Sequence, residues 1–303
     1  MTARISTSID DALAVVRGGG LVAIPTETVY GLAADASNEA AVRRIFAAKG
    51  RPADHPLIVH LAAPDDLPGW AADVPPAAAV LADACWPGPL TLLLPRGERV
   101  LDVVTGGRPA VGLRVPAHPM TTELLTRLGG GLAAPSANRF GQVSPTTAQH
   151  VVDDLGDAVD LVLDGGPCPV GVESTIVDCT VDPPQVLRPG GIATEEIEAL
   201  LGGEVAGASG ASRAPGMLAA HYAPRARVVL TASTAEAAAI AATTPNSWVL
   251  DRTDDLVAAA RSLYADLRDA DTRGVAVVVA VLPPAAGLGH AIRDRLAKAA
   301  AAR

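Results

Sequence analysis

The sequence predicts an α/β protein, with a mixed sheet in the first two thirds of the chain, then a linker and a small parallel α/β domain. Short apolar runs alternate with helical patterns, and some runs succeed one another without a helix between them, which indicates a mixed sheet. A stretch rich in Gly, Ala, Ser and Pro then interrupts the periodicity. We therefore expect a first domain at 1–203, a linker at 204–224 and a C-terminal domain at 225–303.

The first domain opens with a helix whose two ends are marked. Ser8 to Asp11 has the pattern of a capping box, apolar residues then recur at helical spacing, and the glycines at 18–20 end the helix. A strand is predicted at Leu21 to Ile24. Further helices are predicted at 38–48, 76–85, 119–128, 145–155 and 194–201, with short strands around Leu57, Leu92, Val111, Leu132, Leu161, Ile176 and Val186.

The C-terminal domain is predicted to alternate strands and helices. Strands at 226–230, 247–250 and 275–282 are separated by helices near 235–242 and 255–268, and a final helix runs from about His290. This alternation is typical of a small, parallel, three-layered and Rossmann-like unit. Its sequence contains no polar cluster that resembles an active centre, so we expect the chemistry in the first domain.

The composition argues against several classes of protein. With 24 Lys and Arg against 33 Asp and Glu, the net charge of −9 disfavours nucleic acid as the main ligand. The apolar run at 275–282 is stopped by Pro283, well short of the roughly 20 residues that span a bilayer. Cys85, Cys168 and Cys179 lack metal-ligand spacing, and the N-terminus lacks the pattern of a signal peptide. We therefore expect a cytoplasmic, disulfide-free protein without a metal site of its own.

Polar side chains gather where strands of the first domain end. The stretch 25–32 leads from a strand into hydroxyls, a carboxylate and a phenol, and the stretch 49–60 carries Lys49, Arg51 and two histidines. Lys49 is one of only two lysines in the chain. From the residues alone, each stretch could equally be an ordinary turn or the solvated end of a helix whose dipole attracts cations.

Later segments add groups that suit an anion. Arg114 and Arg188 each follow an apolar strand, and 133–147 combines small residues with hydroxyl and amide groups ahead of a helix N-terminus. Cations, hydroxyls and backbone donors spread over one domain describe a site for a polyanion such as a nucleoside triphosphate. The P-loop, dinucleotide-binding, α/β-hydrolase and zincin motifs are all missing. The residues alone therefore indicate an anion-binding α/β enzyme.

A series of motifs, taken in order, carries a resemblance to a known family. They are P-T-E-T-V-Y-G-L at 25–32, K-G-R-P at 49–52, H-P-L-I-V-H at 55–60, W-P-G-P-L-T at 86–91, R-V-P-A-H-P at 114–119, A-P-S-A-N at 134–138, S-P-T at 144–146, G-V-E-S-T-I-V-D at 171–178 and L-R-P-G at 187–190. With these motifs the chain resembles the YrdC-like L-threonylcarbamoyladenylate synthase family. A-P-G-M at 214–217 and H-Y-A-P at 221–224 resemble the linker of its long form, in which a C-terminal accessory domain follows.

The resemblance implies a fold and a reaction. The first domain would be a YrdC-like twisted mixed sheet with an open cleft. L-threonine, bicarbonate and ATP, with Mg²⁺, would give threonylcarbamoyl-AMP and pyrophosphate, the first step of the threonylcarbamoyladenosine modification of tRNA. The product would pass to a downstream threonylcarbamoyl transferase, and the acidic net charge disfavours direct tRNA binding.

The resemblance also assigns roles to residues at matching positions. Lys49 and Arg51 would be catalytic, and Arg114 would bind the threonine carboxylate with its planar fork. The threonine site would be lined by Thr28, His60, Arg114, Ala134 and Ser174, and the ATP site by Lys49, Arg51, His55, Ala110, Ser136, Asn138, Ser144 and Arg188.

Three positions depart from the family pattern. His55 stands where relatives often have asparagine, and Phe140 replaces a serine. Ala110 occupies a position where a relative offers a hydroxyl, so only a backbone contact with ATP would remain there.

The linker carries His221 and Tyr222 after its Gly- and Ala-rich beginning. The two residues could fold over the cleft as a mobile lid that excludes water, or Tyr222 could simply dock the linker. Two other functions remain open for this fold. One is carbamoyl-adenylate formation, as in the YrdC-like modules of hydrogenase-maturation proteins, although the C-x-x-C of their zinc fingers does not occur here. The other is binding of double-stranded RNA.

Overall fold

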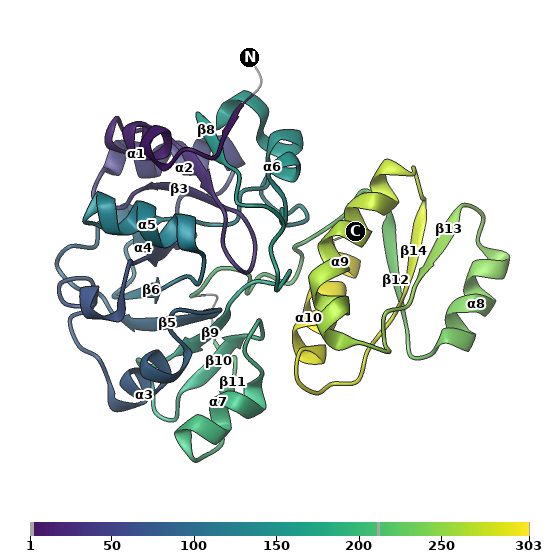
Figure 1. The fold of residues 1–303 in the computed structure, drawn as a ribbon. Coiled ribbons are helices and arrows are strands. Elements are labelled where there is room, and N and C mark those ends of the chain that lie inside the picture. Colours follow the sequence, from purple (N-terminus) through teal and green to yellow (C-terminus); the bar gives the residue numbers. More distant parts are fainter. Residues whose placement is uncertain (1–2, 211–212, 303) are drawn as a thin grey trace.

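The computed structural model describes residues 3–210 and 213–302, so residues 1–2, two linker residues at 211–212 and residue 303 lie outside the description. The described chain forms one sheet of 11 strands and one of three strands. The large sheet belongs to the first domain and the small one to the C-terminal domain. Figure 1 shows the two domains side by side, with α9 (Leu256–Thr272) and α10 (Gly289–Ala300) between the two sheets.

The large sheet is mixed, as the sequence predicts. Its strands are β1 (Arg4–Ser6), β2 (Val22–Ile24), β3 (Gly31–Asp35), β4 (Ile58–His60), β5 (Leu90–Pro95), β6 (Ala110–Arg114), β7 (Leu132–Ala133), β8 (Leu161–Leu163), β9 (Thr175–Asp178), β10 (Gln185–Arg188) and β11 (Ala206–Gly207). Their order is β1-β8-β2-β3-β7-β4-β6-β5-β9-β10-β11. The central pair β4 and β6 is parallel, with His60 opposite Arg114, whereas β3, β7 and β4 pair antiparallel.

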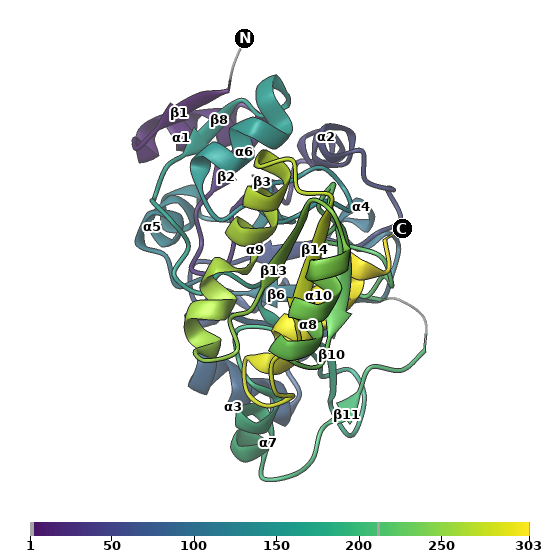
Figure 2. The same ribbon diagram turned by 90° about the vertical axis from the view of Figure 1, so that its right-hand side faces the viewer.

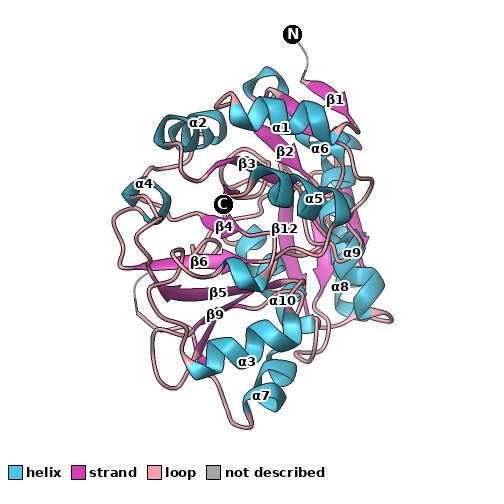
Figure 3. Ribbon diagram, turned by 60° about the vertical axis from the view of Figure 1, so that its left-hand side comes forward, coloured by secondary structure: helices cyan, strands magenta, loops and turns pink. Residues whose placement is uncertain are grey.

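Helices pack on both faces of this sheet. They are α1 (Ile9–Arg17), α2 (Glu39–Lys49), α3 (Pro76–Cys85), α4 (Asp102–Thr105), α5 (Pro119–Leu128), α6 (Ala148–Leu155) and α7 (Thr194–Leu201), with short 3₁₀ turns at Pro64–Asp66 and Gly156–Ala158. Because side chains alternate along a strand, Leu32 joins the core with α2 and α3, whereas Ala33 joins the core with α1 and α5. Figure 3 shows the strands between α1 and α2 at one end and α3 and α7 at the other. None of the described helices is long and apolar enough to cross a membrane.

The ends of α2 are set by its sequence and lead the chain into the site. The Asn38 side chain caps the helix by accepting a hydrogen bond from the Ala41 N–H at 3.1 Å. Gly50 ends the helix with a φ of 63°, a left-handed conformation that glycine adopts without strain. The chain therefore turns sharply after Lys49 and carries Arg51 toward the cavity described below.

Most predicted elements are confirmed, and the misses have local causes. The helix predicted at 145–155 begins only at Ala148, because Thr147 caps it by accepting a hydrogen bond from the His150 N–H at 3.3 Å. The prediction lacked β1, β3, β11 and α4. β3 is built of Gly, Leu, Ala, Ala and Asp and so has no β-branched residue to mark it. β11 lies inside the predicted linker at 204–224 and pairs with β10 of the first domain. The beginning of the linker therefore belongs to the large sheet.

The C-terminal domain is the small parallel α/β unit that the sequence predicts. Its strands β12 (Arg227–Thr231), β14 (Val277–Val281) and β13 (Ser247–Leu250) lie in this order and are parallel. One face packs on α8 (Thr234–Thr243) through Ala237 and Val279, and the other packs on α9 and α10 through Val278, Leu263 and Leu296. The domain therefore has three layers.

The two domains are packed against each other rather than merely tethered. Val143 and Val172 of the first domain share an apolar cluster with Tyr264 of α9. Nearby, Arg268 Nη2 lies 2.6 Å from Asp154 Oδ2, an ion pair with both side chains largely buried. Figure 2 shows the C-terminal domain in front of the large sheet, with α9 next to α6. The interface is thus a continuation of the core.

Gly190 packs directly against the backbone of residues 173–175, which leaves no room for a side chain. A Cβ at position 190 would lie 2.3 Å from Glu173 O and 2.4 Å from Thr175 N, which are backbone atoms that cannot swing aside. We predict that Gly190→Ala lowers the free energy of unfolding by about 1–3 kcal/mol, as measured by urea denaturation. Gly203→Ala is the matched control, because nothing lies within 4 Å of a Cβ there. Equal midpoints for the two variants would contradict the prediction.

Candidate active site

A cavity lies between the first domain and the linker. Its volume is about 50 Å³. It is lined by Thr26, Thr28, Val29, Gly31, Arg51, Ile58, His60, Arg114, Ala134, Pro135, Ser136, Glu173, Ser174, Arg188, Pro215, Gly216, His221 and Tyr222. Of these, the sequence predicted Thr28, Arg51, His60, Arg114, Ala134, Ser136, Ser174, Arg188, His221 and Tyr222 as site residues. Motifs far apart along the chain therefore meet at one place.

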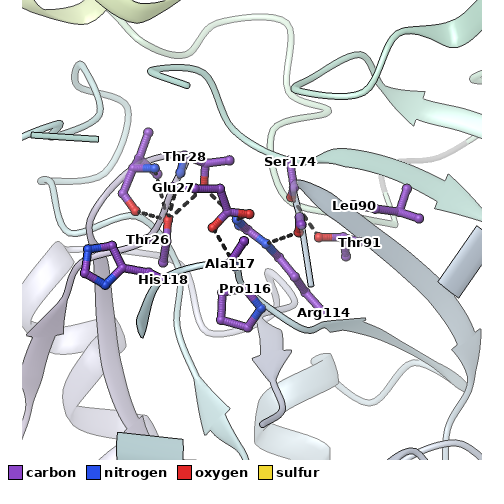
Figure 4. A network of polar contacts seen from close by, with 12 residues as sticks. Thr26, Glu27, Thr28, Leu90, Thr91, Arg114, Pro116, Ala117, His118 and Ser174 are labelled. Atoms are coloured by element: carbon purple, nitrogen blue, oxygen red, sulfur yellow. Dashed lines mark hydrogen bonds and ion pairs between the residues drawn. The ribbon is translucent and has the colours of Figure 1, made fainter. Parts of the chain in front are cut away.

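Arg114 ends β6 and is held by a buried network, shown in Figure 4. Its Nη2 lies 2.7 Å from Glu27 Oε1 and donates to Thr28 Oγ1 at 2.9 Å, and its Nε donates to Gly88 O at 3.3 Å. Glu27 is itself fixed, because its Oε2 accepts a hydrogen bond from the Ala117 N–H at 3.1 Å. Both charged side chains are nearly inaccessible to water, so this pair is little screened. The cavity therefore presents a cation whose orientation is set in advance.

Arg188 ends β10 and clamps the neighbouring strand. Its Nη2 and Nε donate to Ser174 O at 2.8 and 3.1 Å, and Nη2 also donates to Ser174 Oγ at 3.1 Å. Ser174 Oγ lies 2.7 Å from Thr91 Oγ1, and Arg188 Nη1 donates to Pro215 O of the linker at 3.3 Å. Burial lowers the pKa of Arg188, yet a guanidinium stays charged in a protein. Arg188 thus brings positive charge to the junction of the sheet and the linker.

Arg51 is the least satisfied of the cavity cations. Its Nη2 donates to Pro56 O at 2.9 Å, while its Nε is buried and has no hydrogen-bond partner among the described residues. Burial lowers the pKa of Arg51 to about 10, so it is charged at neutral pH. A buried N–H without a partner costs free energy, and an anion in the cavity would relieve that cost.

Lys49 ties a loop of the site to α2. Its Nζ donates to the backbone carbonyls of Ser136 and Asn138. Burial, and then the charge of Arg51, hold the pKa of Lys49 well below its usual range. Lys49 is not among the described residues that line the cavity. Its predicted contact with a triphosphate therefore stays a prediction.

A second cavity of about 200 Å³ adjoins the first and shares Arg51 and His221 with it. His55, Arg108 and Phe140 line this second cavity, and linker residues 215–216 line both. The Phe140 ring lies 5.4 Å from the His55 ring and 6.0 Å from the His221 ring, each edge to face. Phe140, which departs from the serine of the family pattern, thus forms an aromatic contact between the first domain and the linker.

Three other residues predicted for the ATP site lie behind the cavity wall. Asn138 Nδ2 donates to Gln142 O at 2.8 Å, and Ser144 Oγ donates to Glu173 Oε1 at 2.6 Å. Ala110 begins β6 and packs in a small apolar cluster of the sheet. These contacts shape the loops around the cavity, and the predicted contacts of these three residues with ATP stay predictions.

A buried carboxylate, that of Glu173, lines the cavity and was missing from the predicted site. Its Oε2 accepts hydrogen bonds from Tyr264 Oη and Arg295 Nε, each at 2.7 Å. Burial alone would raise the pKa of Glu173, but the charges of Arg295 and Arg188 and the hydrogen bonds from Ser144 and Tyr264 lower it to about 2. Tyr264 and Arg295 belong to the C-terminal domain. Glu173 lay inside a quoted motif, but nothing in the sequence linked it to partners 91 and 122 positions away.

The linker places His221 and Tyr222 on the cavity. Tyr222 is 1% exposed, its ring stacks on that of Tyr264 at 5.7 Å between centroids, and the Arg295 guanidinium carbon lies 5.0 Å from the ring centroid. Tyr222 therefore docks the linker, one of the two roles that the sequence left open. Burial lowers the pKa of His221 and of His60 to about 3, so both imidazoles are neutral at physiological pH.

The cavity is electropositive. Arg51, Arg114 and Arg188 line it, whereas Glu173 is the one carboxylate among the lining residues that the structure describes. Within the described residues, no group of three or more His, Cys, Asp and Glu side chains could hold a metal ion. The arrangement therefore suits a ligand that brings several negative charges.

Two family models match the chain. The model of the Sua5, YciO and YrdC proteins, described as "Telomere recombination", matches residues 14–190, and the model described as "Threonylcarbamoyl-AMP synthase, C-terminal domain" matches residues 192–301. The chain belongs to this family. The second model covers nearly all of the remaining chain, so the chain is a member of the long, two-domain form of the family.

Relatives of this family match the whole length of the chain. A threonylcarbamoyl-AMP synthase of Pyrococcus abyssi is 42% identical over 96% of this chain and 94% of its own, and one of Bacillus subtilis is 38% identical over 100% and 96%. The crystal structure of P. abyssi Sua5 complexed with L-threonine superposes with a TM-score of 0.92 at 40% identity, covering 100% of this chain and 98% of that one. The family fold thus extends over both domains.

The two buried, neutral histidines make stability depend on pH. Their folded pKa values of about 3 lie below the usual 6.5, so below pH 6.5 the unfolded chain takes up protons that the folded chain does not. Their contribution to stability is complete above pH 6.5 and is lost as the pH falls toward 3. We predict a loss of up to about 1.4 kcal/mol per pH unit for each histidine, measured by urea denaturation at pH 7.5, 6.0 and 5.0.

The control for this prediction is His60→Gln, which removes one of the two titrating groups. Its free energy of unfolding should change less steeply between pH 6.5 and 5.0 than that of the unchanged protein. Identical slopes for the two proteins would mean that His60 takes up its proton equally in both states, contrary to its burial.

Proposed function

We infer that this chain is a threonylcarbamoyl-AMP synthase, an enzyme that makes threonylcarbamoyl-AMP and pyrophosphate from L-threonine, bicarbonate and ATP. The observation that carries this conclusion is the match, over the whole chain, to relatives of that name. A nucleotidyltransferase of this kind needs a site that holds several anions together. The electropositive cavity supports the same conclusion, because three arginines line it.

The chemistry explains why the cavity is cationic. The amine of threonine combines with bicarbonate to give a carbamate and water, and a carbamate oxygen then attacks the α-phosphorus of ATP. The bond from the α-phosphorus to the bridging oxygen breaks, and pyrophosphate leaves with its electron pair. Both reactants are anionic, and further negative charge develops on the leaving pyrophosphate. Fixed cations therefore stabilise the transition state more than the bound reactants, and this lowers the barrier.

We propose that Arg114 binds the carboxylate of threonine. Its Nη2 and Nε are held by Glu27, Thr28 and Gly88, so the guanidinium cannot reorient when the substrate enters. The Arg114 side chain is thus already ordered in the folded protein, so binding of the substrate loses little of its conformational entropy. His60 lies opposite Arg114 across the β4–β6 pair and is neutral, so it adds no charge of its own beside Arg114.

We propose that Arg51 and Arg188, which both line the cavity, bind the phosphates of ATP. The unpaired Nε of Arg51 is a donor with no role in the described fold, and Arg188 reaches the cavity between Ser174 and the linker. Magnesium enters in this proposal as part of the Mg·ATP substrate. Glu173, the one carboxylate among the described residues that line the cavity, already accepts hydrogen bonds from three donors, which argues that the phosphates hold the ion.

The RNA-binding alternative fits this site poorly. Backbone phosphates of a duplex need exposed cations along a surface, whereas Arg114 and Arg188 line a cavity and are each 4% exposed. We propose instead that tRNA is modified by a downstream threonylcarbamoyl transferase that accepts the product. The labile mixed anhydride of threonylcarbamoyl-AMP makes a nearby acceptor enzyme advantageous.

The direct test measures pyrophosphate release by the purified full-length chain with ATP and Mg²⁺, while L-threonine and bicarbonate are omitted in turn. We predict release only when both are present, because the attacking carbamate forms from the two together. Mass spectrometry of the product should show threonylcarbamoyl-AMP in amounts equal to pyrophosphate. Equal release without threonine would overturn the substrate assignment.

Arg114→Lys is the control that ties this activity to the cavity. Lysine keeps the charge but lacks the planar fork, so the KM for threonine should rise by about 10-fold or more while the KM for ATP changes little. Arg43→Lys is the matched substitution at an exposed arginine of α2 that pairs only with Glu39 among described residues, and it should leave both KM values unchanged.

A further inference from the structure

The second cavity differs from the first in size and in lining. Its volume is about 200 Å³, against about 50 Å³ for the first. Among the described residues that line it are two arginines, one carboxylate and three rings, namely Arg51, Arg108, Asp54, His55, Phe140 and His221. The first cavity has three arginines against one carboxylate among its described lining residues. The second cavity therefore suits a group that is larger and less charged than the one bound in the first.

Phe140 lies among the rings of the second cavity. The centroid of its ring is 5.4 Å from that of His55 and 6.0 Å from that of His221, each edge to face. Burial, and then the charge of Arg51, lower the pKa of His55, and burial lowers the pKa of His221 to about 3, so both imidazoles are neutral above pH 7. The three rings thus form a wall that carries no charge of its own.

The loop that carries Phe140 is fixed by hydrogen bonds. The Phe140 N–H donates to Lys49 O, at the end of α2, at 2.8 Å, and Asn138 Nδ2 donates to Gln142 O at 2.8 Å. The Phe140 side chain is half-buried, so part of its ring is open to the cavity that it lines. Because the ring is ordered before a ligand arrives, a contact with it costs little conformational entropy.

A nucleobase is the kind of group that such a wall binds. The face of an aromatic ring carries negative potential, which repels phosphate and disfavours pyrophosphate as the occupant. A planar, uncharged base stacks on the ring, and each such contact strengthens binding by about 5-fold or more. Arg51 lines both cavities. A nucleotide that passes Arg51 would therefore place its phosphates among the arginines of the first cavity and its base in the second.

We propose that the second cavity binds the adenine base of ATP and that the Phe140 ring stacks on that base. This inference rests on the proposed function, in which ATP is a substrate. Phe140 stands where the family pattern has a serine. The stacking contact therefore belongs to this chain and does not follow from the motifs that the chain shares with its family.

Phe140→Leu keeps an apolar side chain but removes the aromatic face. Base stacking contributes equally to the bound substrate and to the transition state, so the KM for ATP should rise by about 10-fold while kcat and the KM for threonine change by less than about 3-fold. Phe140→Tyr keeps a ring and should raise the KM for ATP less. Phe46→Leu is the matched control at the other phenylalanine of the chain, which lies in the core of the first domain, and it should leave the KM for ATP unchanged. An unchanged KM for ATP in Phe140→Leu would overturn the proposal.

A second measurement follows the base directly and needs no turnover. In the full-length chain labelled with fluorophenylalanine, the two phenylalanines give two fluorine NMR signals, and Phe46→Leu removes one of them, which assigns both. AMP should shift the Phe140 signal with a saturable dependence on its concentration and leave the Phe46 signal in place, since Phe46 is only 6% exposed. Ribose 5-phosphate, which has the same sugar and phosphate but no base, should shift neither signal.

The outcomes of this titration separate the inference from the proposed function. The titration contains neither threonine nor bicarbonate, so a base-dependent shift of the Phe140 signal supports the inference even if pyrophosphate release fails to need threonine. Equal shifts with AMP and with ribose 5-phosphate would overturn it, because the base would then contribute nothing at Phe140. A Phe140 signal that stays in place at every AMP concentration would overturn it as well.

Discussion

The buried pair of Glu173 and Arg295 is the interaction on which the rest of the structure depends. A carboxylate or a guanidinium buried alone costs several kcal/mol, and these two are buried and lie 2.7 Å apart across the domain interface. Arg188 and Asp294 add a further opposite charge to each within its own domain, and separating the domains would break the pair that joins them. Docking brings Tyr264 under Tyr222, and this sets the linker against the cavity. Fold, linker and site are in this sense one arrangement.

The two lysines of the chain also hold separate segments of the structure together. Lys49 Nζ donates to two carbonyls of the loop that carries Ser136, and Lys298 Nζ donates to Gly216 O of the linker and to Asp294. Each amino group is desolvated and ties a loop of the cavity to the end of a helix. In a chain that otherwise uses arginine, both lysines thus lie where their compact amino groups can donate to backbone carbonyls. The two lysines thus hold loops of the cavity in place without being among the described residues that line it.

Local signals predicted much of this structure, and long-range packing explains what they missed. Ser8 caps α1 as expected, and the motifs that carry Arg51, Arg114 and Arg188 do meet in one cavity. The sequence could not tell which polar residues of a motif face inward, because that depends on register and on loop closure. The Ser144 hydroxyl, for example, donates to Glu173, and its predicted contact with ATP stays a prediction. Nor could the sequence pair Glu173, in the loop before β9, with helix residues of a different domain, since no local pattern encodes contacts between residues so far apart along the chain.

Cooperative unfolding of the two domains tests this view most directly. The chain has three tryptophans, Trp70 and Trp86 in the first domain and Trp248 in the C-terminal domain, which fluorine-labelled tryptophan reports as separate NMR signals. We predict that the three native signals disappear together at one urea concentration, because separating the domains would break the Glu173–Arg295 pair and expose the apolar cluster that the two domains share. Loss of the Trp248 signal at clearly lower urea than the other two would contradict it, since the C-terminal domain would then unfold while the first domain kept its cavity.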